Sequence, residues 1–174
     1  MMSELSELIL RRIRDVPDYP RPGVVFKDIT PLLADHTAFG AVVDELAGLC
    51  EGIDKVVGIE ARGFILAAPV AYRAGAGFVP VRKKGKLPAE TLQRSYDLEY
   101  GSAIVEVHRD AFEPGERVLI VDDVLATGGT ARATVDLVRE AGAEVVGAAV
   151  LMELAFLAGR DQLAGLDLRS LVIV

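Results

Sequence analysis

The sequence predicts an α/β fold in which helices flank a doubly wound, mainly parallel sheet. Short apolar runs rich in Val and Ile alternate along the chain with segments whose apolar residues recur at helical spacing. One such run, residues 118–121, ends at the acids Asp122 and Asp123, as is typical of a strand buried on both faces of a parallel sheet. The 174 residues suffice for one domain with a sizeable core, so we expect a single domain over residues 1–174.

In the first half of the chain, an N-terminal arm precedes alternating helices and strands. The arm begins with a segment that mixes acids with apolar residues, which predicts an amphipathic helix. The elements expected here are a helix over 3–14, a loop over 17–34, a helix over 35–50, a strand over 53–59, a helix over 63–74 and a strand over 78–82.

The second half begins with a polar excursion. Residues 85–94 hold Gly, Pro and several charges, so they resemble a mobile lid more than a packed element. Weak alternation over 95–107 indicates an antiparallel pair beside this lid. The remaining expected elements are a strand over 117–122, a helix over 129–141, a strand over 144–152, a short helix near 156–163 and a strand over 168–174.

Composition narrows the classes of function. A net charge of −7 disfavours general nucleic-acid binding, which needs a basic face. No apolar run reaches the roughly 18–20 residues that a membrane helix needs. The N-terminus shows no cleavage site, and the single Cys50 excludes an internal disulfide framework. We therefore expect a cytoplasmic protein with neither a nucleic acid nor a membrane as partner.

The segment Ala126-Thr-Gly-Gly-Thr130 follows one expected strand and opens the next helix. Its backbone N–H groups are free to face an anion, and the helix N-terminus adds its positive end. Gly128 and Gly129 let the backbone approach that anion with no Cβ in the way. The segment predicts a phosphate site. It has neither the Lys of a nucleoside-triphosphate loop nor the G-x-G-x-x-G pattern of a dinucleotide site, so both of these are disfavoured.

Asp122 and Asp123 lie just before this phosphate site, at the carboxyl end of the strand, where ligands bind in open α/β sheets. Adjacent carboxylates there suit a sugar diol or a metal ion. A phosphate with hydroxyls a short distance away describes a ribose 5-phosphate. The alternative interpretation is a capped loop followed by a solvated acid pair.

Two further segments carry anion-binding groups at the same expected edge. Glu60-Ala-Arg-Gly63 follows a strand and opens a helix, and the planar guanidinium of Arg62 suits a phosphate. Residues 82–86, Arg-Lys-Lys-Gly-Lys, place four cations in five positions directly after the next strand. A solvated surface is the alternative for both segments.

The segment from Asp122 to Thr130 resembles the phosphoribosyl-pyrophosphate motif of type I phosphoribosyltransferases. Further motifs occur in family order and narrow the resemblance to the adenine phosphoribosyltransferases. They are Phe26-Lys-Asp-Ile-Thr-Pro31, Glu60-Ala-Arg-Gly63, and Gly85-Lys-Leu-Pro88 with Tyr96-Asp-Leu-Glu-Tyr-Gly101. The resemblance covers nearly the whole chain. It implies the type I fold, with a small hood from residues 1–34 and the C-terminal part, and a flexible lid over about 83–95.

The resemblance also implies the activity, which is purine salvage: adenine and 5-phosphoribosyl 1-pyrophosphate give AMP and pyrophosphate. It implies a homodimer, in which Arg82 reaches the neighbour's pyrophosphate, and a Mg²⁺ ion held mainly by substrate oxygens. No metal cage of protein ligands is expected, because His36 and His108 have no acidic or Cys partner at ligand spacing.

The family's site residues carry over by position. Glu99 is implied to act beside the base, donating a proton to N7 or helping to remove the N9 proton, and Arg62 is the second implied catalytic residue. The residues implied to bind phosphoribosyl pyrophosphate or AMP are Asp122, Asp123, Ala126, Thr127, Gly128, Gly129, Thr130, Glu60, Ala61, Gly63, Arg82, Lys83, Lys86 and Tyr100. Ala61 stands where the family more often has Ser.

Adenine is implied to lie between Phe26 on one face and Leu154 on the other, with the backbone of Val25 and Lys27 at its N1/N6 edge. Such a loop distinguishes adenine from 6-oxopurines, since wrongly paired buried groups cost about 1–3 kcal/mol each. Two alternatives stay open: a phosphoribosyltransferase for another base, such as xanthine or guanine, and a non-catalytic regulator that senses the donor or a purine.

Overall fold

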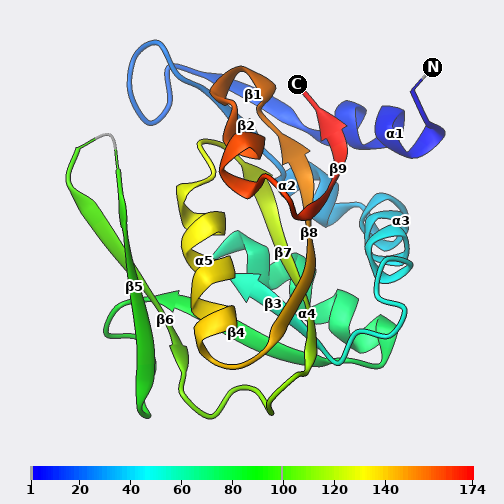
Figure 1. The fold of residues 1–174 in the computed structure, drawn as a ribbon. Coiled ribbons are helices and arrows are strands. Elements are labelled where there is room, and N and C mark those ends of the chain that lie inside the picture. The colour runs from blue at the N-terminus through cyan, green and yellow to red at the C-terminus, as the bar shows by residue number, and fades with distance from the viewer. Residues whose placement is uncertain (1, 99) are drawn as a thin grey trace.

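The computed structural model describes residues 2–98 and 100–174, and its centre is a seven-stranded sheet (Figure 1). Its strands are β3 (Lys55–Ile59), β4 (Gly77–Lys83), β5 (Thr91–Asp97), β6 (Ser102–His108), β7 (Arg117–Leu125), β8 (Glu144–Glu153) and β9 (Asp167–Ile173). Their order across the sheet is β5-β6-β4-β3-β7-β8-β9. The five strands from β4 to β9 in this order are parallel, and β6 and β5 extend the sheet in antiparallel fashion. The predicted α/β class with a mainly parallel sheet is confirmed.

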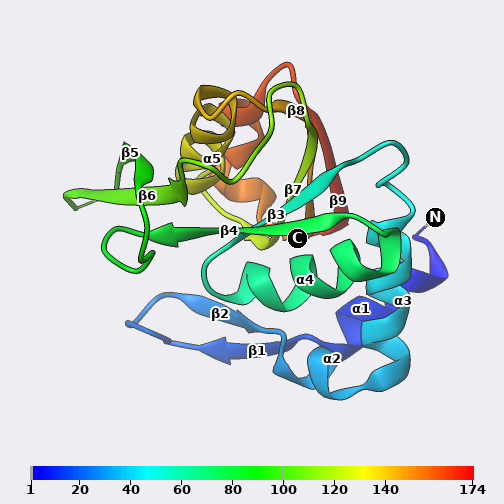
Figure 2. The same ribbon diagram turned by 90° about the horizontal axis from the view of Figure 1, so that it is seen from below.

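Helices cover both faces of this sheet. Helix α5 (Gly129–Glu140) lies on one face, whereas α3 (His36–Ala47) and α4 (Arg62–Ala74) lie on the other (Figure 2). Successive residues of a strand point to opposite faces, so Val56 joins the core beneath α3 and α4 while Val57 joins the core beneath α5. Both residues are fully buried, which explains why the central strands are continuous apolar runs.

The N-terminal arm is more ordered than its sequence predicts. Its elements are α1 (Glu4–Arg12), β1 (Arg14–Pro17), β2 (Val25–Asp28) and α2 (Thr30–Ala34). The expectation of a loop over 17–34 was therefore wrong for β2 and α2. The two strands form a separate antiparallel pair of four residues each, too short to present an apolar alternation. Polar contacts join them instead, among them an ion pair of 2.7 Å between Lys27 and Asp15.

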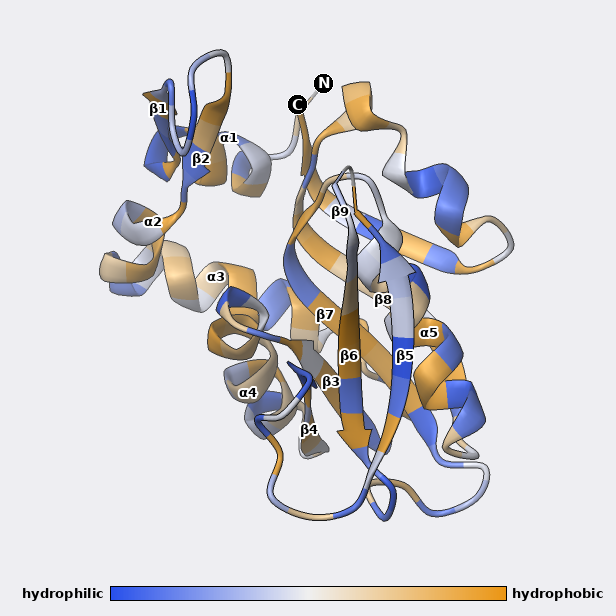
Figure 3. Cartoon of the chain, turned by 90° about the vertical axis from the view of Figure 1, so that its left-hand side faces the viewer, coloured by the Kyte–Doolittle hydropathy of each residue, from blue (hydrophilic) through white to orange (hydrophobic). Residues whose placement is uncertain are grey.

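The polar excursion after β4 also differs from the expectation. Residues 91–97 form β5, which pairs along its length with β6, so part of the lid expected over 83–95 is a sheet strand and the loop spans 84–90. In Figure 3, β5 is mostly white to blue, whereas the central strands carry orange stretches. An edge strand with one exposed face lacks the apolar run by which a buried strand is recognised.

The C-terminal half follows the prediction closely, with two changes. Strand β7 continues to Leu125, three residues beyond the expected end, because its pairing with β8 continues to Glu153. Two short 3-10 helices, η1 (Ala155–Leu157) and η2 (Gly159–Leu163), replace the single helix expected near 156–163. The Ser6 hydroxyl donates to the Leu171 carbonyl at 3.0 Å, which ties α1 to β9. No helix in the described part of the chain is long and apolar enough to span a membrane.

Candidate active site

Two loops meet at the carboxyl edge of the sheet because the strands that precede them are parallel neighbours. Strand β3 leads through Glu60 and Ala61 into α4, and β7 leads through residues 126–128 into α5. Together they enclose a cavity of about 360 Å³. The lining residues are Ile59, Glu60, Ala61, Arg62, Asp122, Asp123, Val124, Leu125, Ala126, Thr127, Gly128, Gly129, Thr130 and Ala131. The topology thus brings together two segments that the sequence singled out separately.

The loop 126–130, which we call the phosphate loop, is built from main chain held in a tight space. Gly128 caps the N-terminus of α5 with a φ of 85°, a left-handed conformation that favours glycine. Its carbonyl accepts the first helical bond, from Arg132, at 2.9 Å. A Cβ on Gly128 would overlap the Gly159 carbonyl oxygen, and a Cβ on Gly159 would overlap the Ala126 carbonyl oxygen. The first residues of α5, 129–131, line the cavity, and the N–H groups at the start of a helix have no partner within it.

The acid pair lies inside strand β7 and beside the N-terminus of α4. Asp123 keeps 7% of its side-chain exposure and forms an ion pair with Arg62, whose Nε lies 2.8 Å from Oδ2. The Asp123 N–H donates to Asp122 Oδ1 at 2.8 Å. Burial and the neighbouring Asp123 carboxylate raise the pKa of Asp122 well above its ordinary value of 3.8. A Cβ on Gly63 would lie 2.7 Å from Asp122 Oδ1, so α4 packs closely on this pair.

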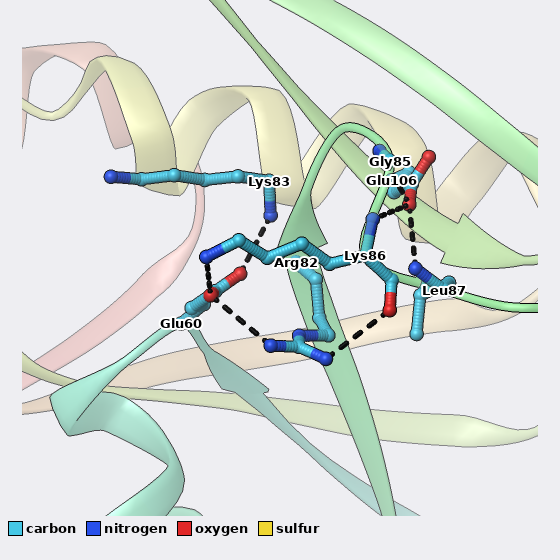
Figure 4. Close-up of polar contacts among 7 residues, drawn as sticks. All are labelled: Glu60, Arg82, Lys83, Gly85, Lys86, Leu87 and Glu106. Atoms are coloured by element: carbon cyan, nitrogen blue, oxygen red, sulfur yellow. Dashed lines mark hydrogen bonds and ion pairs between the residues drawn. The ribbon is translucent and has the colours of Figure 1, made fainter.

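Glu60 contacts cationic residues at the end of β4 and in the loop that follows it (Figure 4). Lys86 Nζ lies 2.6 Å from Glu60 Oε1, and Arg82 Nη2 lies 3.3 Å from the same oxygen. The Lys83 backbone N–H donates to Oε2 at 2.9 Å, while the Lys83 side chain extends away from this cluster. Burial acts to raise the pKa of Glu60, but the hydrogen bonds from Lys86, Lys83 and Arg82 outweigh it and lower the pKa from 4.5 to about 2.

The residues implied to bind the base lie on separate elements. The Phe26 ring, on β2, lies 5.1 Å from the Arg62 guanidinium and meets the Tyr19 ring edge-on at 5.2 Å. The first contact connects β2 to the cavity through Arg62. The Leu154 N–H donates to the Leu125 carbonyl at 3.0 Å, at the edge of the cavity. Val25 is 52% exposed.

The remaining residues singled out in the sequence do not line this cavity or fall outside the described residues. Tyr100 lies in the turn between β5 and β6 and is 79% exposed. Glu99 falls outside the described residues.

The peptide bond between Glu60 and Ala61 is cis. Across residues 2–98 and 100–174, no three His, Cys, Asp or Glu side chains gather where they could hold a metal ion.

Sequence reasoning missed several residues at this site. Tyr96 on β5 lines a second cavity of about 200 Å³ together with Glu60, Arg82 and Thr130. Gly159, the first residue of η2, packs on the phosphate loop. Tyr96 opens one of the motifs quoted above, although no role was assigned to it, whereas Gly159 carries no local signal because it meets the site only through the folding of distant segments.

Comparison with known proteins agrees with this geometry. The chain matches the phosphoribosyl transferase domain family over residues 33–166. It is 65% identical to an adenine phosphoribosyltransferase of Thermobifida fusca, over the full length of both chains. The crystal structure of the Rhodothermus marinus adenine phosphoribosyltransferase is 52% identical, covers 98% of both chains and superposes with a TM-score of 0.93.

A more distant structure carries ligands. The Saccharomyces cerevisiae adenine phosphoribosyltransferase, solved with adenine and an imino-altritol bisphosphate, is 35% identical, with a TM-score of 0.91 over 96% of this chain and 98% of that one. These likenesses span both halves of the cavity and all the motifs of the sequence. The chain belongs to the adenine phosphoribosyltransferase family and has its type I fold.

Proposed function

We propose that the chain is a purine-salvage enzyme that converts adenine and 5-phosphoribosyl 1-pyrophosphate to AMP and pyrophosphate. The observation that carries this proposal is one cavity lined by the phosphate loop, the acid pair and Arg62, with Glu60 in its wall holding the cations Arg82 and Lys86 beside it. The names of the relatives over the full length of the chain support it.

In this proposal the phosphate loop binds the 5-phosphate of the sugar. Ala126, Thr127, Gly128, Gly129 and Thr130 present main-chain N–H groups and hydroxyls, and the positive end of α5 adds to their attraction. The lack of space for a Cβ at Gly128 supports a role for the backbone, since a phosphate requires close approach.

Asp122 and Asp123 bind the ribose hydroxyls. Charged hydrogen bonds of this kind contribute about 1.5–3 kcal/mol each. The raised pKa of Asp122 supports the assignment, because a buried acid beside another acid is unfavourable for the protein alone and is better satisfied by hydroxyl donors.

The leaving pyrophosphate lies between the 60–63 turn and the segment 82–86. Arg62 provides a planar pair of donors, Ala61 and Gly63 provide backbone, and Arg82, Lys83 and Lys86 provide positive charge. Glu60 pairs with both Arg82 and Lys86. We propose that the incoming pyrophosphate takes over these cations from Glu60.

Adenine lies against Phe26, with the backbone of Val25 and Lys27 at its N1/N6 edge and Leu154 on its other face. Glu99 acts on the base as a general acid or base, which typically contributes roughly 10²–10⁴-fold in rate. Tyr100, in the exposed turn between β5 and β6, reaches the phosphate end of the substrate when that turn moves toward the cavity.

Departure of pyrophosphate leaves positive charge on the sugar, so the residues of this chain act mainly by positioning and electrostatics. We propose that Mg²⁺ arrives on the oxygens of the substrate. The chemistry at the cavity fits such an ion, because Asp122 and Asp123 offer two carboxylates that could complete its shell while most of its ligands come from pyrophosphate and ribose. A bound ion of this kind reduces the negative charge of the leaving group.

We further propose that the enzyme is a cytoplasmic homodimer. Exposed apolar side chains on neighbouring elements, Ile65 and Tyr72 on α4 and Phe78 on β4, support a partner surface. The unpaired Cys50 fits a reducing compartment.

Pyrophosphate release, measured with 5-phosphoribosyl 1-pyrophosphate and Mg²⁺ and each of adenine, guanine, hypoxanthine and xanthine, tests the function. We expect release with adenine and the appearance of AMP. Turnover with another base and not with adenine would identify a different phosphoribosyltransferase. Binding of the donor without release for any base would identify a regulator.

A further inference from the structure

Glu106 is a buried acid that the proposed reaction does not use. It lies in β6 between Val105 and Val107 and keeps only 2% of its exposure. A buried carboxylate is unfavourable unless hydrogen bonds or charges satisfy it. Its surroundings therefore indicate what it is there to hold.

The partners of Glu106 come from the loop 84–90, which we call the basic loop (Figure 4). Its Oε1 accepts three consecutive backbone N–H groups, from Gly85 at 3.1 Å, Lys86 at 3.2 Å and Leu87 at 3.0 Å. Its Oε2 accepts from the hydroxyl of Thr91 at 3.4 Å and the amide of Gln93 at 3.2 Å, just after the loop. Burial acts to raise the pKa of Glu106, yet these backbone bonds prevail and lower it.

This arrangement fixes the backbone of the basic loop and leaves its charged ends free to exchange partners. The Lys86 backbone N–H is held by Glu106, while its ammonium contacts Glu60, 2.6 Å away. The Lys86 carbonyl in turn accepts from Arg82 Nη1 at 3.2 Å. Lys86 thus connects the buried Glu106 to Glu60 through its ammonium and to Arg82 through its carbonyl.

We propose that Glu106 is a positioning residue that shapes the basic loop so that Lys86 and Arg82 face the pyrophosphate of the donor. The inference rests on the proposed function for the identity of that ligand. With the backbone fixed, Lys86 moves from Glu60 to the pyrophosphate by side-chain rotation alone. Without Glu106, three backbone donors lose their acceptor and the loop must be ordered again each time the donor binds.

Steady-state kinetics of Glu106→Ala and Glu106→Gln test this role. We expect Glu106→Ala to raise the KM for phosphoribosyl pyrophosphate by about tenfold or more, from the loss of hydrogen bonds to a charged group. The KM for adenine stays within about twofold. Glu106→Gln keeps an oxygen that accepts from the loop, so its KM for the donor falls between those of the wild type and the Ala variant. Glu140→Ala is the control, because it removes an acid that pairs with Arg94 on the same hairpin.

Limited trypsin digestion gives a second measurement, independent of turnover. The bonds after Lys84 and Lys86 lie in the basic loop, and we expect them to be cut faster in both Glu106 variants than in the wild type and in Glu140→Ala. A donor KM unchanged in both variants, equal rises in the KM for both substrates, or unchanged cutting would overturn the proposal. If Glu106→Ala does not fold, Glu106→Gln decides alone on the same criteria. If the wild type makes no AMP, the proposed function fails, whereas faster cutting still reports that Glu106 anchors the loop.

Discussion

The phosphate loop and the basic loop both bind anions in the proposed reaction, but they are built in opposite ways. The phosphate loop presents main-chain N–H groups, and its backbone packs against Gly159 so closely that no Cβ fits. The basic loop and the end of β4 before it present the ends of long cationic side chains, Lys86 and Arg82, which pair with Glu60. Close packing fixes the backbone of the phosphate loop, whereas ion pairs with Glu60 hold the cationic side chains of the basic loop.

This difference matches what each ligand group does in the reaction. The 5-phosphate stays attached to the sugar throughout, so a rigid site that never changes serves it best. The pyrophosphate leaves, and a cation that has an internal carboxylate to return to releases it more readily. The phosphate loop should therefore respond most to added side-chain volume, and the basic loop to a change of charge.

The largest effect is expected from Gly159→Ala. The added methyl group overlaps the Ala126 carbonyl oxygen and pushes the phosphate loop out of place. Overpacking of this kind costs about 1–3 kcal/mol of stability, and a displacement near 1 Å reduces kcat/KM by roughly 100-fold. Steady-state kinetics and thermal unfolding measure the two effects.

Gly40→Ala is the matched control, since a Cβ on Gly40 in α3 meets no atom within 4 Å. We expect it to keep full activity and to gain about 0.5–1 kcal/mol of helix stability. If Gly159→Ala were as active as Gly40→Ala, the phosphate loop would not depend on close packing.

Asp122→Ala is expected to reduce kcat/KM by roughly 10- to 150-fold, because it removes a charged hydrogen bond worth about 1.5–3 kcal/mol. Near-normal kinetics in this variant would mean that the acid pair does not bind the ribose.

Replacing Asp122 is expected to lower activity but to raise the stability of the fold. The folded pKa of Asp122 is raised above 3.8, so the folded state binds more protons and stability falls as the pH rises from about 4 to the folded pKa. Asp122→Asn removes the buried charge, and we expect it to unfold at a higher temperature than the wild type at pH 7. A lower unfolding temperature would show that Arg62 already compensates the pair.

The comparison also explains what could be predicted from the sequence. The phosphate loop was recognisable because its chemistry lies in five consecutive residues between a strand and a helix. Its support was not recognisable, because Gly159 lies some thirty residues away and meets Ala126 only after β8 is laid beside β7. A glycine in a turn has the same appearance in a sequence whether or not another backbone packs on it.

For the basic loop too, the charged residues could be recognised in the sequence but their partners could not. The four cations at 82–86, two of which precede this loop, stand out in the sequence, but their partner Glu60 belongs to a different motif and Glu106 belongs to none. An acid within an apolar strand is the one signal that was available for Glu106. The β1–β2 pair was missed, and the first strand of the antiparallel pair expected over 95–107 begins earlier, at Thr91, for a related reason, since short or edge strands lack a buried apolar run.

A smaller effect is expected from Lys86→Ala. The loss of one partly exposed charged hydrogen bond raises the KM for phosphoribosyl pyrophosphate by about tenfold, and the donor KM becomes less sensitive to salt. Lys84→Ala, on an exposed lysine of the same loop, is the control and is expected to change the KM by less than about twofold. Equal effects of the two variants would mean that the loop acts only through its overall charge.

The smallest effect is a pH dependence of stability that comes from Glu60. Its folded pKa of about 2 lies below its ordinary 4.5, so the unfolded state binds the proton first as the pH falls. The stabilisation from Glu60 is fully present above about pH 4.5 and is lost as the pH falls through 2. Urea unfolding of the wild type and Glu60→Gln therefore differs most near neutral pH, and the difference shrinks between pH 4.5 and 2. A difference that stayed constant over this range would mean that the cations near Glu60 do not stabilise its charge. Charge pairing would then not distinguish the basic loop from the phosphate loop.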